Sequence, residues 1–147
     1  MLSRLSACAR SALLAATLLF AVTASAQMHT PPPGSRERVA ILDSVRVPLA
    51  PLFVAPVRLK VDVLNVDGGW AFVLAQAQDR DGAAAQYRDS AYVEAVVAGG
   101  MSHAVATLLR LEVQGWQIVA QSVGITDVSW EAWPIEHAAP QRIFALP

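Results

Sequence analysis

The three histidines are the side chains best suited to bind a transition metal or to transfer a proton near neutral pH. His29, His103 and His137 are far apart, and none has the H-x-x-x-H or H-E-x-x-H spacing of helical metal sites. After cleavage before Gln27, His29 would be the third residue, where an amine, two amides and an imidazole can bind Cu(II) or Ni(II) in a plane. A terminal glutamine can cyclise and remove that amine, so we predict no metal site.

Acid–base catalysis would need a carboxylate whose pKa is raised toward the working pH. Three aspartates lie in predicted turns, where this residue is favoured for its local hydrogen bonds: Asp67, Asp79 and Asp81. His103, beside a predicted strand, and Asp127, after another, are the remaining candidates for such chemistry. The single cysteine, Cys8, precedes the expected mature chain, and no serine has a G-x-S-x-G context. We therefore predict no catalytic residue and no cofactor.

The tryptophans give the strongest indication of a binding surface. Trp130 and Trp133 are three residues apart, so one helical turn would place both on one face. Tryptophan is enriched at binding hot spots, which favours an aromatic contact surface. The same spacing also fits a segment that folds back and covers the sheet, and the sequence leaves both interpretations open. The predicted binding surface consists of Asp127, Trp130, Trp133, His137 and Arg46.

The chain has 147 residues, of which 54% are hydrophobic, and a net charge of −1. Residues 1–26 combine an early basic residue, an apolar run and a terminal Ala24-Ser25-Ala26, which is typical of a secretory signal peptide. The near-neutral charge argues against nucleic-acid binding, which favours a basic face. The apolar run is about half the length that spans a bilayer, so we predict no stable membrane insertion after cleavage. We expect a periplasmic or secreted protein.

The sequence after the leader predicts a proline-rich spacer at 27–35 and one α+β domain at 36–147. Ser35 is a good N-cap for an amphipathic helix from Arg36 to about Val47, with Val39, Leu42 and Val45 at helical spacing. A proline-broken loop follows. The alternation over 57–63 predicts a half-buried strand whose inward residues are Val57, Leu59, Val61 and Val63.

Two hairpins complete the predicted order of elements. The first strand pairs with 70–77 through the turn Asp67-Gly68-Gly69, and 104–113 pairs with 116–123 through Gln114-Gly115. The segment 83–101 between the hairpins is predicted as a short helix or an irregular excursion that ends at Gly99-Gly100. Asp127 is expected to cap one helical turn through Trp133, and 142–144 to form a short strand. This order predicts an antiparallel sheet of about four strands with the helix packed on it.

The segment 108–119, with its central Gly115-Trp116, is similar to a hairpin found in NTF2-like and cystatin-like α+β rolls. The wider pattern, which includes Ala40-Ile41-Leu42-Asp43 and Trp70-Ala71-Phe72-Val73, resembles small exported bacterial domains. The resemblance implies that the helix lies across a curved sheet. The roll families include isomerases, dehydratases and binding domains, so the resemblance does not decide the function.

We expect an exported, non-catalytic binding module whose partner is a protein or a small apolar ligand. One alternative is a small roll-type isomerase or hydratase that acts on an apolar ligand. Another alternative is an inhibitor of an extracellular hydrolase, which would present a rigid loop such as 79–85. The sequence leaves the oligomeric state open.

Overall fold

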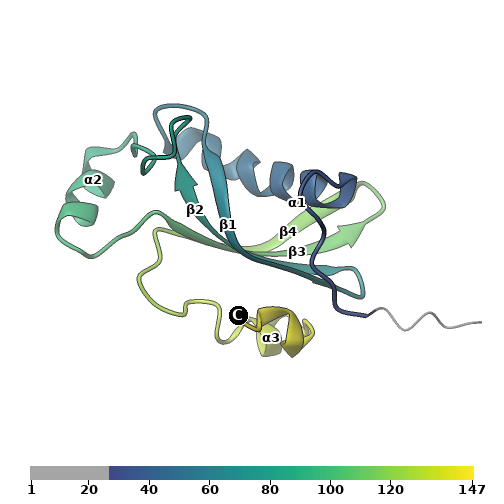
Figure 1. Ribbon diagram of the computed structural model, residues 1–147. Helices are drawn as coiled ribbons and strands as arrows, with labels where there is room; N and C mark the ends of the chain where they lie inside the picture. The colour runs from purple at the N-terminus through teal and green to yellow at the C-terminus, as the bar shows by residue number, and fades with distance from the viewer. Residues whose placement is uncertain (1–26) are drawn as a thin grey trace, which may run out of the picture.

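The computed structural model describes residues 27–147, and the predicted signal peptide lies outside them. The described chain is α+β, with a four-stranded antiparallel sheet in the order β1-β2-β3-β4 (Figure 1). The helices and strands are α1 (Arg36–Arg46), η1 (Val47–Leu52), β1 (Arg58–Asp67), β2 (Trp70–Gln78), α2 (Ser90–Val97), β3 (Ala104–Glu112), β4 (Gly115–Val123), α3 (Trp133–Glu136) and η2 (Gln141–Phe144), where η denotes a 3₁₀ helix.

Both predicted hairpins are present, and pairing between β2 and β3 joins them into one sheet. The β1–β2 turn uses Gly68 and Gly69 at φ values of 55° and 81°. Positive φ at both central residues suits the twist of a two-residue hairpin turn, and glycine adopts it without a steric penalty. These two glycines therefore fix the register of the first hairpin.

Helix α1 covers one face of the sheet. The side chain of Ser35 caps it by accepting a hydrogen bond from the amide of Arg38 (3.3 Å). The buried residues of α1 are Ile41, Leu42 and Val45, whereas Val39, which shares the helical spacing of Leu42 and Val45, remains 48% exposed. The buried side chains on this face form the α1-side core, whose largest members include Ile41, Val45, Leu49, Phe53, Val73, Val105 and Leu109.

Strand β1 changes the face that it presents partway along its length. Val61 pairs with Ala75 and Val63 pairs with Leu74, so Asp62 is an extra residue that forms a β-bulge. Leu59 and Val61 pack against the α1-side core, but Val63 joins the core on the other face. The prediction that Val63 shares an inward face with them is therefore wrong.

The C-terminal segment covers the second face of the sheet (Figure 1). The tail at 142–144 is part of the 3₁₀ helix η2, so the predicted short strand is wrong. The side-chain amide of Asn65 on β1 donates hydrogen bonds to the carbonyls of Ile143 (3.0 Å) and Ala145 (3.1 Å). This segment and the sheet together form the C-terminal-side core, whose members include Val63, Phe72, Leu108, Trp130, Trp133, Ile143 and Phe144.

Candidate functional site

Helix α2 lies beyond one end of the sheet (Figure 1), and none of its residues is buried. Its sequence is SAYVEAVV, in which Tyr92 and Val93 are partly exposed and Val97 is 84% exposed. A helix of a globular protein normally packs its apolar stripe against a core. Val96 packs against the α1-side core, and the ring of Tyr92 meets that of Tyr87 edge-on (5.7 Å between centroids). Residues 88–100, which we name the α2 arm, therefore present chiefly Val93, Val97 and part of Tyr92 to the surroundings.

Two local signals define the ends of this helix. The carboxylate of Asp89 accepts a hydrogen bond from the amide of Ala91 (2.8 Å), which is N-cap geometry. At the other end Gly99 has φ 76°, and its amide donates to the carbonyl of Val96 (3.0 Å). The sequence left a short helix and an irregular excursion open for 83–101, and the structure has a short helix that ends at the glycine pair. The pattern of residue types did not indicate that the apolar side chains would remain exposed.

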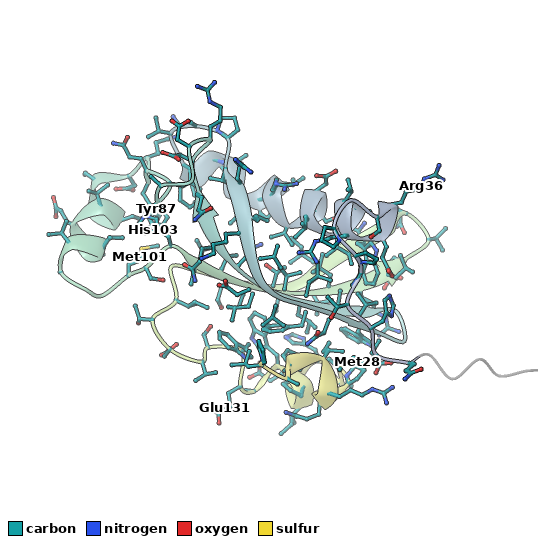
Figure 2. The ribbon with its side chains drawn as sticks, viewed as in Figure 1. Met28, Arg36, Tyr87, Met101, His103 and Glu131 are labelled. Atoms are coloured by element: carbon teal, nitrogen blue, oxygen red, sulfur yellow. The ribbon has the colours of Figure 1, made fainter. Side chains whose placement is uncertain are left out.

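The base of the α2 arm is held by Tyr87, which is buried. Its ring stacks on Phe53 (4.6 Å between centroids) and on His103 (5.2 Å), and its hydroxyl donates to the carbonyl of Ser102 (2.7 Å). Figure 2 shows Tyr87 and His103 together near Met101, where the arm joins the sheet. Burial raises the pKa of Tyr87 to about 12, with a smaller contribution from Tyr92. Tyr87 is therefore a neutral anchor that donates a hydrogen bond.

A crevice of about 270 Å³ separates α2 from the base of the arm. The residues that line it are Ala84, Ala85, Gln86, Tyr87, Val93, Val96, Val97 and His103. The lining is therefore mainly apolar, with an imidazole on one wall. This chemistry suits an apolar side chain of a partner, and it lacks the paired acid and base that proton transfer requires.

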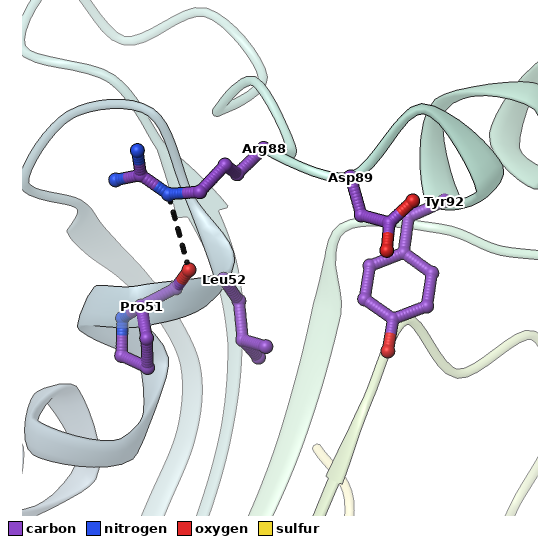
Figure 3. A pocket seen from close by; sticks show the side chains of 5 residues that line it. All are labelled: Pro51, Leu52, Arg88, Asp89 and Tyr92. Atoms are coloured by element: carbon purple, nitrogen blue, oxygen red, sulfur yellow. Dashed lines mark hydrogen bonds between the residues drawn. The ribbon is translucent and has the colours of Figure 1, made fainter.

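A second hollow, of about 320 Å³, lies between η1 and α2. Figure 3 shows the five residues that line it: Pro51, Leu52, Arg88, Asp89 and Tyr92. Arg88 donates from Nε to the carbonyl of Pro51 (3.3 Å) and from Nη2 to that of Phe53 (2.8 Å), and Asp89 caps α2. The charged groups of this hollow therefore hold the arm in place.

The two tryptophans of the predicted binding surface are buried. Trp130 and Trp133 are each 7% exposed, and the ring of Trp130 lies 5.6 Å from that of Phe72 on β2. They do not form an exposed aromatic lip, because the C-terminal segment folds back over the sheet and large apolar rings are most stable out of water. Of the two interpretations that the sequence left open, the one in which this segment covers the sheet is confirmed.

The other predicted site residues do not come together. Asp127 is exposed in an irregular segment, and α3 begins at Trp133 without a side-chain cap, so the predicted cap is wrong. The helix begins there because Pro134 suits a first turn, where its missing amide leaves no hydrogen bond unmade. Arg46 pairs with Asp43 (2.7 Å) on α1, which covers the opposite face of the sheet from α3. His137 is the C-cap of α3.

The histidine nearest to the N-terminal end of the described chain is held by a carboxylate. His29 Nε2 lies 2.8 Å from Glu37 Oε2, and this hydrogen bond raises the pKa of His29. The amide of His29 donates to the carbonyl of Val66 (2.9 Å), so the predicted spacer contacts β1. Square-planar copper binding would require that amide as a ligand. Over residues 27–147 no group of three or more His, Cys, Asp or Glu side chains is arranged to hold a metal ion.

The buried carboxylate of Asp67 is paired with a cation. Asp67 is 2% exposed and accepts hydrogen bonds from the guanidinium of Arg142, one of them at 2.8 Å. These bonds lower the pKa of Asp67, although desolvation acts in the opposite direction. The carboxylate is therefore kept ionised, and it joins η2 to the end of β1.

No protein-family model matches the chain, and no curated protein or solved structure shows significant similarity to it. Within the described range, no helix has both the length and the apolar character needed to cross a bilayer.

Proposed function

We propose that the chain is an exported, non-catalytic binding module that contacts a protein partner through the α2 arm. The observation that carries the proposal is a helix with exposed tyrosine and valine side chains and no buried residue. Contact with a partner would remove this apolar surface from water, which is the main favourable term in most protein association. Export is part of the proposal and depends on the leader-like residues 1–26.

The way in which the arm is held also supports a contact role. The stack of Phe53, Tyr87 and His103 fixes its base, and the hydrogen bonds of Arg88 fix the turn that leads into α2. An arm that is already ordered loses less conformational entropy on binding than a mobile one. The apolar crevice beside α2 would accept a side chain from the partner. A resemblance to the NTF2-like and cystatin-like rolls, which include binding domains, agrees with this function.

The geometry gives less support to the enzymatic alternative. A roll-type isomerase or hydratase would need a desolvated carboxylate whose pKa is raised. Asp67, the buried carboxylate of the described residues, has its pKa lowered by Arg142.

The inhibitor alternative has a specific observation in its favour. Loop 79–85 is braced by the Asp79 carboxylate, which accepts from the amides of Asp81 and Ala83 (2.9 Å each). Arg80 at its tip has a side chain that is 93% exposed. A protease inhibitor commonly presents such a rigid loop to its target. The α2 arm remains the better candidate because it offers apolar contact area.

The test is a cross-linking capture of partners from a periplasmic extract with the wild-type chain, Val97→Lys and Val113→Lys. Val97 is on the α2 arm, and Val113 is a fully exposed valine in the β3–β4 turn. A lysine in the last turn of α2 suits the helix dipole, so the arm should stay folded. We expect wild type and Val113→Lys to capture a partner that Val97→Lys loses. Equal capture by these three proteins, or no specific capture, would contradict the proposal. Arg80→Ala is a fourth variant that tests the inhibitor alternative, and capture lost in this variant alone would favour that alternative.

A further inference from the structure

Strand β4 is the last strand of the sheet, and among residues 27–147 it pairs with β3 alone, along one edge. The carbonyl of Trp116 accepts a hydrogen bond from the hydroxyl of Ser44 (2.9 Å) at the other edge. Main-chain groups alternate between the two edges of an antiparallel strand. The amide and carbonyl of Ile118, two residues after Trp116, therefore point toward the same open edge. Those of Gln121 do so as well, because Val119 is an extra residue that shifts the alternation by one.

The two edges of the sheet differ in how they are protected. The outer edge of β1 carries Arg58, Lys60 and Asp62, and near its end Val66 exchanges two hydrogen bonds with His29. Charged side chains and covering segments are the usual means by which proteins prevent edge pairing. Strand β4 has the sequence GWQIVAQSV, which contains no charged residue and no proline. Among the described residues, this edge is limited by a bulge at Val119 and by the hydrogen bond from Ser44 of α1 to the carbonyl of Trp116, and neither feature places a charge on the strand.

A groove of about 530 Å³ runs between the end of α1 and β4. The residues that line it are Ser44, Val47, Pro48, Trp116, Gln117, Ile118 and Gln121. Trp116 and Ile118 belong to the α1 face of the strand, whereas Gln117 between them faces the other way, so the groove follows the edge. Val47 is 74% exposed on its rim. The open edge is thus bordered by apolar surface that a paired strand would cover.

We propose that a second copy of this chain pairs with β4 in antiparallel orientation, around a two-fold axis near Val119, to give a continuous sheet across two protomers. The strand is neutral along all nine residues, so pairing with itself places no like charges opposite each other. The same surface serves both partners in a two-fold interface, and an antiparallel pair of identical strands meets this condition. This surface shares no residue with the α2 arm, and the inference is independent of the function proposed for that arm.

The symmetry gives a charge-swap test. Val119 is 37% exposed and lies near its own copy in the proposed dimer, so Val119→Lys would bring two positive charges together. We expect sedimentation equilibrium to show a reversible monomer–dimer equilibrium for wild type. The dissociation constant should increase at least about tenfold for Val119→Lys and for Val119→Glu separately, because like charges across an interface disfavour pairing. An equimolar mixture of the two variants should recover the dimer, and Val113→Lys in the adjacent turn should behave as wild type.

Circular dichroism would establish that each variant is folded. As a second measurement, Val119→Cys in a Cys8→Ser background should form an intermolecular disulfide on mild oxidation, whereas Val113→Cys should not. Sedimentation of wild type as a monomer at every concentration would overturn the proposal. A dimer that survives both charged variants, or variants that do not pair when mixed, would also overturn it, because the contact would then lie elsewhere.

Discussion

Replacement of Trp130 by alanine measures how strongly the C-terminal segment is attached to the sheet. The indole is 7% exposed and packs against Phe72. A tryptophan side chain removes roughly 150–250 Å² from water, and at about 25 cal/mol per Å² this corresponds to roughly 4–6 kcal/mol. That value is an upper bound, because unfolded chains already bury part of their apolar surface. We therefore expect Trp130→Ala to lower the free energy of unfolding by about 3–5 kcal/mol, as for other buried aromatic residues.

The assay is urea unfolding followed by far-ultraviolet circular dichroism, which reports on the sheet. Val113→Ala is the control: Val113 is fully exposed, so its loss should change the free energy of unfolding by less than about 0.5 kcal/mol. Trp130→Phe keeps an apolar ring and should cost less than Trp130→Ala. A loss below about 1 kcal/mol for Trp130→Ala would refute the reasoning, since the average substitution already costs that much. The indole would then be free to form a contact surface.

Two further predictions concern ion pairs. Glu37→Gln should lower the pKa of His29 toward its ordinary value of 6.5, measured by NMR titration of the imidazole, and an unchanged pKa would show that Glu37 is not its cause. Because folding raises the pKa of His29, its pair with Glu37 stabilises the wild-type protein fully below pH 6.5. This stabilisation is lost as the pH rises through the pKa of His29 in the folded state. Arg142→Gln should raise the pKa of Asp67 and move acid unfolding, followed by circular dichroism, to higher pH. Because folding lowers the pKa of Asp67, the ion pair stabilises the folded protein above pH 3.8, and this stabilisation is lost as the pH falls through the pKa of the folded state. Identical midpoints of acid unfolding for wild type and Arg142→Gln would therefore argue against the pair.

Local signals were sufficient to predict most of the sheet and the helix on it. Ser35 begins α1 as its cap, and the turn at Gly68-Gly69 joins β1 to β2. Both depend on backbone requirements that a few neighbouring residues satisfy by themselves. For this reason the two hairpins could be predicted without any information about tertiary contacts.

The bulge at Asp62 could not be predicted in the same way. Apolar and charged residues alternate without interruption from Val57 to Val63, so this pattern of residue types carries no sign of the bulge. Its effect is to place Val63 under the C-terminal segment and Leu64 under α1. Which face each valine occupies depends on two layers that are distant in sequence, so the alternation was a correct signal for a strand but not for its faces.

The candidate site was harder to predict because burial is a property of the whole fold. Trp130 and Trp133 have the spacing of a contact helix, yet they fill the core beneath the sheet. Val93 and Val97, four residues apart, also share a helical face, yet they remain 39% and 84% exposed. Periodicity identifies apolar residues that share a face, and only the packed structure determines whether that face is covered.

Both faces of the sheet are occupied, by α1 on one side and by the C-terminal segment on the other. This packing leaves the edge of β4 and the arm beyond the end of the sheet available for association. A dimer formed through β4 would carry two α2 arms, and a partner with repeated binding sites would be held more tightly by two arms than by one. Val119→Lys should then weaken binding to a multivalent partner while leaving a monovalent fragment unaffected. Val97→Lys should weaken both, because it changes the contact itself.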